Sequence, residues 1–178
     1  AHNAAEAKKC VELARSHGFD SLTIDLIYGT PTLSDENWAT NLQLAVDLDV
    51  QHLSCYALTV EPKTALDHFV QKGKTPAPTD EQTARQFHFM VEFLEKSGFE
   101  HYEISNFCKP PFYAKHNSSY WASSSYLGIG PSAHSFNGHS RQWNVANNAH
   151  YMNAIENNRL DFEMEELTPE DQFNEFLM

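Results

Sequence analysis

The chain has 178 residues, of which 41% are hydrophobic. That length supports one core of ordinary size, so we expect one main domain rather than two large ones. Aspartate and glutamate total 24 against 12 lysines and arginines, and the formal net charge is -12. This excess of negative charge would repel DNA or RNA, which excludes nucleic acid as an expected partner.

Three cysteines occur far apart in the sequence, at Cys10, Cys55 and Cys108. Their spacing fits neither a disulfide framework nor the short ligand spacings of metal sites, and it favours a reducing compartment. No apolar run approaches the roughly 18–20 residues that cross a bilayer, and the first residues lack a signal peptide. We therefore expect a cytoplasmic, soluble protein that does not span a membrane.

Both ends of the sequence suggest a piece of a longer protein. The chain opens without methionine, and a helix with good capping residues begins at Thr168, shortly before the last residue, Met178. We therefore expect the sequence to be a fragment.

The first predicted element is an amphipathic helix, because apolar residues recur at helical spacing over residues 4–14 and Gly18 follows as a stop. A largely apolar strand is predicted from Ser21 to Tyr28, ended by Gly29 and Pro31. Such a run is typical of a strand that is covered on both faces.

A second helix is predicted from about Asp35 to Leu48. Ser34 is a favourable N-cap, and an apolar stripe is formed by Trp38, Leu42 and Ala45. A second short strand follows over His52–Leu58. The two strands are expected to lie next to each other in parallel, joined by this helix.

A third helix is predicted between Thr79 and Gly98, where Thr79 and Gln82 have the spacing of a capping box. Tyr102–Phe107 is predicted as a third strand, after which the alternation of helix and strand is lost. This order of elements predicts α/β units with a parallel sheet, either open or closed into a barrel.

Asp25 lies within the first predicted strand, on the face that it shares with Thr23 and Ile27. One interpretation is a buried carboxylate that accepts hydrogen bonds from backbone or hydroxyl groups. The other is a functional carboxylate that accepts hydrogen bonds from ribose hydroxyls near the carboxyl end of a barrel strand. The residues alone favour neither.

A Gly-x-Gly-x-x-Ala string occurs at Gly128, Gly130 and Ala133. A dinucleotide-binding loop of this kind should follow the first strand of a βαβ unit and be followed by an acidic residue about 20 positions later. The surroundings here are aromatic and rich in serine. We therefore interpret the string as a tight backbone turn.

His116 is followed by two large aromatic residues, Tyr120 and Trp121. A single histidine in a loop is usually polar surface. A neutral imidazole is nevertheless a good iron ligand, and flat aromatic side chains suit a flat macrocycle.

Taken together, these segments resemble the radical S-adenosylmethionine (radical SAM) family of oxygen-independent coproporphyrinogen III oxidase-like proteins. The resemblance covers nearly the whole chain and is specific in order and spacing. It is carried by four segments, which are Ile24–Pro31, Leu53–Pro62, Tyr102–Phe107 and His116–Ala133.

This resemblance implies a partial (β/α)6 TIM-like radical SAM barrel, of which residues 1–101 form the second half. Residues 102–166 would be a family-specific extension with the haem-type motif, and residues 167–178 the truncated start of a C-terminal helical domain. The family's Cys-x3-Cys-x2-Cys loop, which holds a [4Fe–4S] cluster that binds SAM, would lie upstream. The fragment itself is therefore expected to be inactive in SAM cleavage, and the open edge of its first strand is expected to favour self-association.

The resemblance also implies site residues. Asp25 and Ile27 match positions that contact the SAM nucleoside, and Tyr56 with Thr59 matches the adenine side. The string His116-Asn117-x-x-Tyr120-Trp121 looks like the haem motif of the family's chaperone branch; in this sequence it is carried by His116, Asn117, Tyr120 and Trp121.

Two functions occur within the family, haem chaperone and oxidase, and the haem motif favours the haem chaperone. A haem chaperone binds haem or porphyrin and delivers haem to haem-requiring membrane proteins. An oxygen-independent coproporphyrinogen III oxidase decarboxylates propionates oxidatively in haem biosynthesis. A third hypothesis is an α/β fragment that binds nothing.

Overall fold

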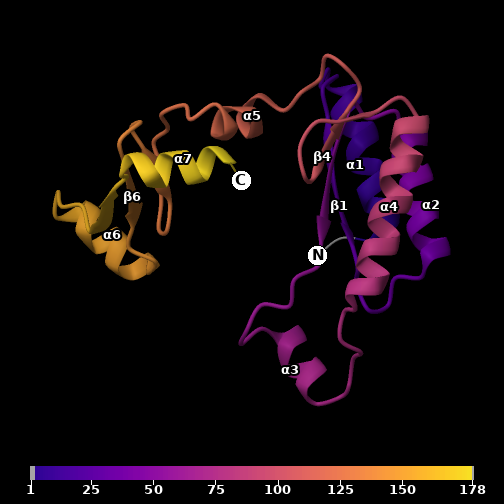
Figure 1. The fold of residues 1–178 in the computed structure, drawn as a ribbon, viewed down its shortest axis with the longest axis horizontal. Coiled ribbons are helices and arrows are strands. Elements are labelled where there is room, and N and C mark those ends of the chain that lie inside the picture. The colour runs from indigo at the N-terminus through magenta and orange to yellow at the C-terminus, as the bar shows by residue number, and fades with distance from the viewer. Residues whose placement is uncertain (1–2, 178) are drawn as a thin grey trace. The chain divides into compact units, whose positions relative to one another are not determined.

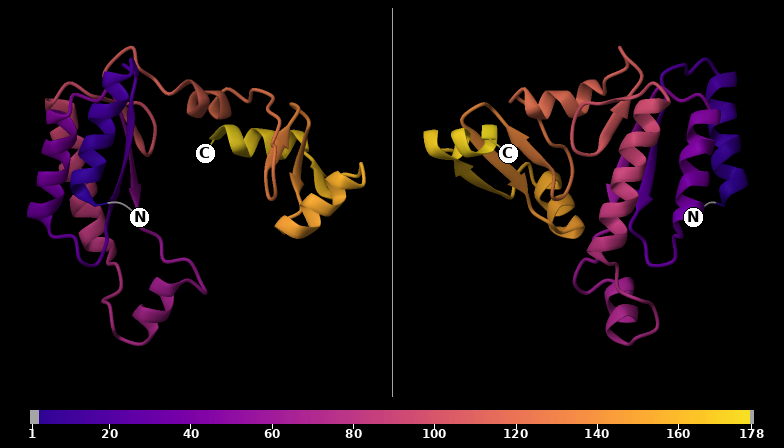
Figure 2. Two further views of the ribbon diagram at one scale, coloured as in Figure 1. Left: turned by 180° about the vertical axis from the view of Figure 1, so that it is seen from behind. Right: turned by 45° about the vertical axis from the view of Figure 1, so that its right-hand side comes forward.

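A computed structural model describes residues 3–177, although the side chains of residues 120, 121 and 175–177 lie outside that description. The chain forms two compact units, Ala1–Tyr113 and Ala114–Met178, and each is described by itself. Figures 1 and 2 show the helices and strands of both units. Among the described residues, no helix is long and apolar enough to cross a membrane.

The first unit is built on a four-stranded sheet in the order β1-β2-β4-β3. Its elements are α1 (Ala4–Ser16), β1 (Thr23–Tyr28), α2 (Asp35–Asp47), β2 (His52–Ala57), α3 (Ala65–Gln71), α4 (Asp80–Lys96), β3 (Glu100–His101) and β4 (Asn106–Cys108). β1 pairs in parallel with β2, while β4 runs antiparallel to both β2 and β3. The predicted parallel pair, joined by a helix that begins at Asp35, is confirmed.

The core of this unit lies between the sheet and the helices α2 and α4, which lie side by side along it (Figures 1 and 2). The predicted stripe on α2 is buried, with Trp38, Leu42 and Ala45 at most 3% exposed. Along β1, however, exposed residues alternate with covered ones. The expected cover on both faces of β1 is therefore wrong for this chain, because the core packs against only one face.

The helix ends follow local capping chemistry with one difference from the prediction. The hydroxyl of Thr79 accepts a hydrogen bond from the backbone N–H of Gln82 at 3.2 Å. The Gln82 side chain does not close the capping box; it donates instead to the carbonyl oxygens of Thr30 and Leu33, at 3.0 and 2.9 Å. Gln82 thereby ties the loop after β1 to the start of α4.

The predicted strand over Tyr102–Phe107 is wrong as a single element. β3 ends at His101 and β4 begins at Asn106, and the two pair antiparallel with His101 opposite Phe107. The intervening turn is held by Ser105, whose N–H donates to the Glu103 carboxylate at 3.1 Å. Turn chemistry therefore divides what looked like one strand.

The second unit contains an antiparallel sheet in the order β5-β6-β7. Its elements are α5 (Lys115–Trp121), β5 (His134–Phe136), β6 (Ser140–Asn144), α6 (Asn148–Glu156), β7 (Phe162–Glu166) and α7 (Pro169–Leu177). A helix does begin after Thr168, whose hydroxyl accepts from the N–H of Asp171 at 3.1 Å. The implied boundaries at residues 101 and 166 stay predictions.

The edge position of β1 agrees with the open strand edge that the resemblance implies, since β1 has a hydrogen-bonded neighbour on one side in this sheet. Unpaired edges favour pairing with other chains. The self-association of the chain stays a prediction.

Cysteine burial gives a testable expectation. Cys10 is exposed, whereas burial raises the pKa of Cys55 to about 12, helped by the charge of Asp25, and raises that of Cys108 to about 11, helped by Glu100. Because the thiolate is the reactive form, only Cys10 should react quickly with an aromatic disulfide reagent at pH 8. The absorbance of the thiolate released from the reagent should show one fast-reacting thiol. Cys55 and Cys108 should react only when urea unfolds the chain. Three equally fast thiols would contradict this arrangement.

Candidate functional site

Three predicted residues meet on the open face of the first sheet. Asp25 and Ile27 are two positions apart on β1, and Ile27 pairs in register with Tyr56 on β2. Paired residues of neighbouring strands share a face, so Asp25, Ile27 and Tyr56 form one surface. Asp25 is exposed, and the side chains of Ile27 and Tyr56 are 53% and 43% exposed. The surface offers a carboxylate beside two apolar groups.

Thr59, the fourth residue of this group, is exposed just beyond the end of β2. The N–H of Leu58 donates to the Tyr28 carbonyl at 2.9 Å, so the contact between the two strands continues past Ala57. Thr59 therefore begins the connection at the carboxyl edge of the parallel pair. That edge is where the sites of parallel α/β barrels are built.

A polar row extends sideways from Asp25 on the same face. Asp25 is paired with Ser54, which is paired in turn with Asn106. Ser54 and Asn106 are buried, and the amide oxygen of Asn106 has no hydrogen-bond partner in the part of the chain that the structure describes. This row was not predicted, although the alternation of Ser54 with Tyr56 along β2 places both side chains on the face of Asp25.

His52 is the first residue of β2, lies on the same face as Ser54 and is also buried. Its Nε2 lies 2.7 Å from the hydroxyl of Tyr102, and the two rings are 5.8 Å apart between centroids. Burial lowers the pKa of His52, and the charge of Asp25 opposes that effect without reversing it. The imidazole is therefore neutral at neutral pH. A contact between residues 50 positions apart left no local signal in the sequence.

The turn after β1 fixes the carboxyl end of that strand. The N–H of Gly29 donates to the side-chain oxygen of Gln86 at 2.8 Å, and Gly29 has a φ of 71°. A side chain at Gly29 would approach the hydroxyl of Thr83 to 2.7 Å. Glycine is required both by this conformation and by the close approach of α4.

The haem-type residues lie in the second unit, on α5 rather than on the predicted loop. His116 is exposed, and its carbonyl oxygen accepts a hydrogen bond from the hydroxyl of Ser119 at 2.6 Å. Asn117 is partly buried on the same helix. The side chains of Tyr120 and Trp121 lie outside the described residues, so the apolar wall stays a prediction.

The glycine string lies in the second unit between α5 and β5, and it forms a tight turn against antiparallel strands. Tyr126 and Phe136 exchange two backbone hydrogen bonds of 2.9 Å, and Asn144 donates to the carbonyl of Gly130 at 2.9 Å. A dinucleotide loop would instead connect a parallel strand to a helix. The interpretation as a backbone turn agrees with this geometry.

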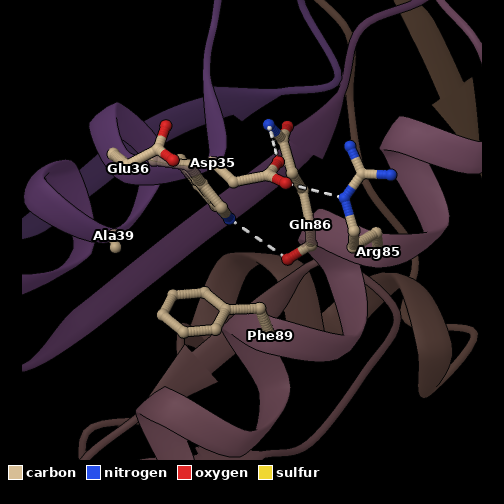
Figure 3. A pocket seen from close by; sticks show the side chains of 7 residues that line it. Asp35, Glu36, Ala39, Arg85, Gln86 and Phe89 are labelled. Atoms are coloured by element: carbon tan, nitrogen blue, oxygen red, sulfur yellow. Dashed lines mark hydrogen bonds and ion pairs between the residues drawn. The ribbon is translucent and has the colours of Figure 1, made fainter.

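A pocket of about 380 Å³ opens between α2 and α4 (Figure 3). The Trp38 indole N–H donates to the Gln86 carbonyl at 3.1 Å, and Arg85 contacts Asp35 at 2.7 Å. The Arg85 guanidinium, followed by the Gln86 amide, lowers the pKa of Asp35. None of the predicted site residues lines the pocket, which is formed by Asp35, Glu36, Trp38, Ala39, Arg85, Gln86 and Phe89.

The residues that the structure describes do not form a metal centre. Within residues 3–177, no group of three or more histidine, cysteine or acidic residues is arranged to hold a metal ion. Cys10 lies on α1, Cys55 on β2 and Cys108 on β4, and the last two are buried. These thiols do not fit a cluster that needs several thiolates in one loop.

Comparison with known proteins identifies relatives that match most of the chain, although no protein-family model matches it. The chain is 34% identical to the haem chaperone HemW of Bacillus subtilis over 175 residues, which is 98% of this chain and 46% of that protein. It is 39% identical to HemW of Mycobacterium tuberculosis over 144 residues, covering 81% of this chain and 37% of the relative. The mitochondrial radical S-adenosyl methionine domain-containing protein 1 of Danio rerio is 35% identical over 133 residues, covering 75% of this chain and 30% of the relative.

The fold also matches a solved structure. Coproporphyrinogen III oxidase (HemN) from Escherichia coli, a radical SAM enzyme, aligns over 99% of this chain and 44% of its own chain, with a TM-score of 0.79 and 22% identity. The chain thus spans less than half the length of these proteins. The predicted fold class, the later part of a partial radical SAM barrel followed by an extension, is confirmed. The chain is thus related over most of its length to the haem chaperone HemW proteins and has the fold of a radical SAM enzyme.

Proposed function

We propose that the chain is the haem-binding part of a radical SAM haem chaperone. The observation that carries this proposal is the identity of 31–39% to several proteins named haem chaperone HemW. The motif at His116, Asn117, Tyr120 and Trp121 supports it, since it resembles the motif of the chaperone branch. The cargo would be haem, and the recipient a haem-requiring membrane protein.

His116 is the residue proposed to bind the haem iron. It is exposed on α5, where an imidazole nitrogen can approach a large planar ligand without displacing core residues. Neutral imidazole is a common axial ligand of haem iron. Adjacent aromatic residues at positions 120 and 121 would cover apolar macrocycle surface that water hydrates poorly.

The open face of the first sheet is proposed to bind SAM in a protein of the relatives' length. The Asp25 carboxylate would accept hydrogen bonds from the ribose hydroxyls, while Ile27, Tyr56 and Thr59 would pack beside the nucleoside. When bound next to a reduced [4Fe–4S] cluster, SAM supplies a carbon radical. The cysteines of this chain do not fit that cluster, so its ligands would come from another part of a longer protein.

The oxidase alternative has weaker support than the chaperone proposal. The likeness to HemN is at 22% identity and shows a shared fold, not a shared substrate. The chaperone proposal has relatives of higher identity and a motif of its own. We therefore keep haem binding as the function to test.

Adding haem to the chain should give a saturable Soret band, and His116→Ala should abolish or strongly shift that band because the iron loses its protein ligand. Spectrophotometric titration measures both the spectrum and the affinity. His150→Ala is a matched control, because His150 is also an exposed helical histidine of the second unit. Asp25→Asn should leave the band intact, since the two sites serve different ligands.

Two outcomes would contradict the proposal. If the chain takes up haem with the same spectrum and affinity after His116→Ala, the iron ligand is wrong and the oxidase becomes the better hypothesis. If the unaltered chain shows no saturable change with haem, the fragment binds nothing and the third hypothesis stands.

A further inference from the structure

The turn between α5 and β5 presents two aliphatic side chains to solvent. Leu127 is 78% exposed and Ile129 is 83% exposed, more than any other large apolar side chain that the structure describes. Exposed side chains of this size usually lie singly at a surface, and a pair in one short segment is a candidate contact surface. We call Leu127 and Ile129 the aliphatic pair.

The backbone beneath the aliphatic pair is firmly held. The N–H of Gly128 donates to the Ser135 hydroxyl at 3.0 Å, and the N–H of Gly130 donates to the Tyr151 hydroxyl at 3.2 Å. The buried amide of Asn144 donates to the carbonyl of Gly130 at 2.9 Å. A surface that is already ordered loses little conformational entropy on binding, which favours affinity.

Gly128 fixes the direction of the two side chains. A Cβ built at Gly128 would collide with the His134 carbonyl oxygen and lie 2.7 Å from the carbon of that carbonyl. Side chains alternate along a β-like segment, so Leu127 and Ile129 lie together on the side away from β5. Both are consequently available to one flat ligand.

The segment that carries the aliphatic pair is less acidic than the rest of the sequence. The chain has 24 acidic residues, yet none occurs between Glu103 and Glu156. Within the second unit this segment carries Lys115 and Arg141, and Arg141 pairs with Glu165 of β7 at 3.3 Å. An anionic ligand is therefore repelled least in this segment. A basic protein partner would prefer the acidic remainder of the chain.

We propose that the aliphatic pair forms the apolar platform on which the macrocycle of an anionic porphyrin packs. The proposal rests on the haem-binding function proposed above and adds a contact that does not involve iron. The flat apolar macrocycle would cover Leu127 and Ile129, and the propionates would lie in the segment without carboxylates. His116, on α5 of the same unit, would supply the iron ligand.

The test measures binding of haem and of iron-free protoporphyrin IX to the 178-residue chain by absorbance and porphyrin fluorescence. The double variant Leu127→Ser/Ile129→Ser should weaken both ligands by about tenfold or more, because burial of aliphatic surface is lost. His116→Ala should alter only the haem spectrum, since the iron-free ligand needs no axial ligand. Leu127→Glu should weaken both ligands more than Leu127→Gln does.

A matched control is provided by Leu160 and Met164, which are 61% and 56% exposed in the same unit but lie among acidic residues. Leu160→Ser/Met164→Ser should leave both affinities unchanged. Equal weakening by both double variants would indicate general hydrophobic adsorption and overturn the platform.

Two further outcomes distinguish a failure of the platform proposal from a failure of the haem-binding proposal. Unchanged affinities in Leu127→Ser/Ile129→Ser, with haem still bound through His116, would overturn the platform and leave the haem-binding proposal intact. Absence of any saturable binding of haem or protoporphyrin IX to the unaltered chain would overturn both. Circular dichroism would show whether each variant keeps its fold, which is expected because all four side chains are largely exposed.

Discussion

Trp38→Ala is expected to lower the free energy of unfolding of the first unit by about 3–5 kcal/mol, the cost of removing a large buried aromatic side chain. Trp38 is 1% exposed, and its ring lies 5.6 Å from that of Tyr28 between centroids. Its indole N–H also donates to the Gln86 carbonyl at 3.1 Å. The substitution would enlarge the pocket between α2 and α4 and remove the contacts that Trp38 makes with Tyr28 of β1 and Gln86 of α4.

Urea denaturation followed by far-ultraviolet circular dichroism would measure this loss. Phe89→Ala is the matched control, because Phe89 lines the same pocket but is 43% exposed. The loss of stability in Phe89→Ala should be clearly smaller than in Trp38→Ala, since nearly half of the Phe89 side chain already contacts water. Equal losses in the two variants would show that Trp38 does not anchor the contact between the helices.

Much of the first unit could be predicted from local chemistry. Ser34 accepts from the N–H of Asn37 at 3.2 Å as an N-cap should, and the stripe of α2 is buried as its helical spacing indicates. The parallel pairing of β1 and β2 followed from the short connection through one helix. These features depend on residues that are close in sequence.

The parts that could not be predicted depend on residues far apart in sequence. Gln86 looks like a polar interruption of an apolar stripe, yet it is 1% exposed and its side-chain oxygen accepts from Gly29 at 2.8 Å. Its amide nitrogen donates to the Leu33 carbonyl at 3.1 Å. A buried polar side chain must find partners, but the sequence does not say which ones.

In the candidate sites, too, features set by neighbouring residues could be predicted, whereas contacts between distant residues could not. The alternation along β1 placed Asp25 and Ile27 on one face, and the resemblance added Tyr56, which the strand register brings beside Ile27. The buried contact between His52 and Tyr102 was missed because it depends on how the turn after β3 returns to the sheet. The face was therefore predictable, whereas its polar row was not.

Gly128→Ala is the second large effect that we expect, because the added methyl group would meet backbone atoms that cannot rotate away. Besides the collision with the His134 oxygen, the new carbon would lie 2.7 Å from the His134 carbonyl carbon and 2.8 Å from that of Ala133. Overpacking of this kind costs about 1–3 kcal/mol, and sometimes more, when the neighbours cannot shift. Relief requires the segment 126–130 to move away from β5.

Hydrogen exchange measured by NMR would detect that movement, because the amides of Tyr126 and Phe136 donate to each other's carbonyl oxygens at 2.9 Å in the intact turn. Both amides should lose protection in Gly128→Ala, while amides of β2 in the first unit keep theirs. Gly138→Ala is the control, since Gly138 has a φ of 95° but no atom within 4 Å of its would-be Cβ. That variant adds backbone strain in the connection between β5 and β6 but does not push the turn away from β5.

If Gly128→Ala keeps full protection at Tyr126 and Phe136, the turn is not held by close backbone contact. If protection is lost, porphyrin affinity should fall with it even though Leu127 and Ile129 are unchanged, because the platform depends on a backbone that holds both side chains in place.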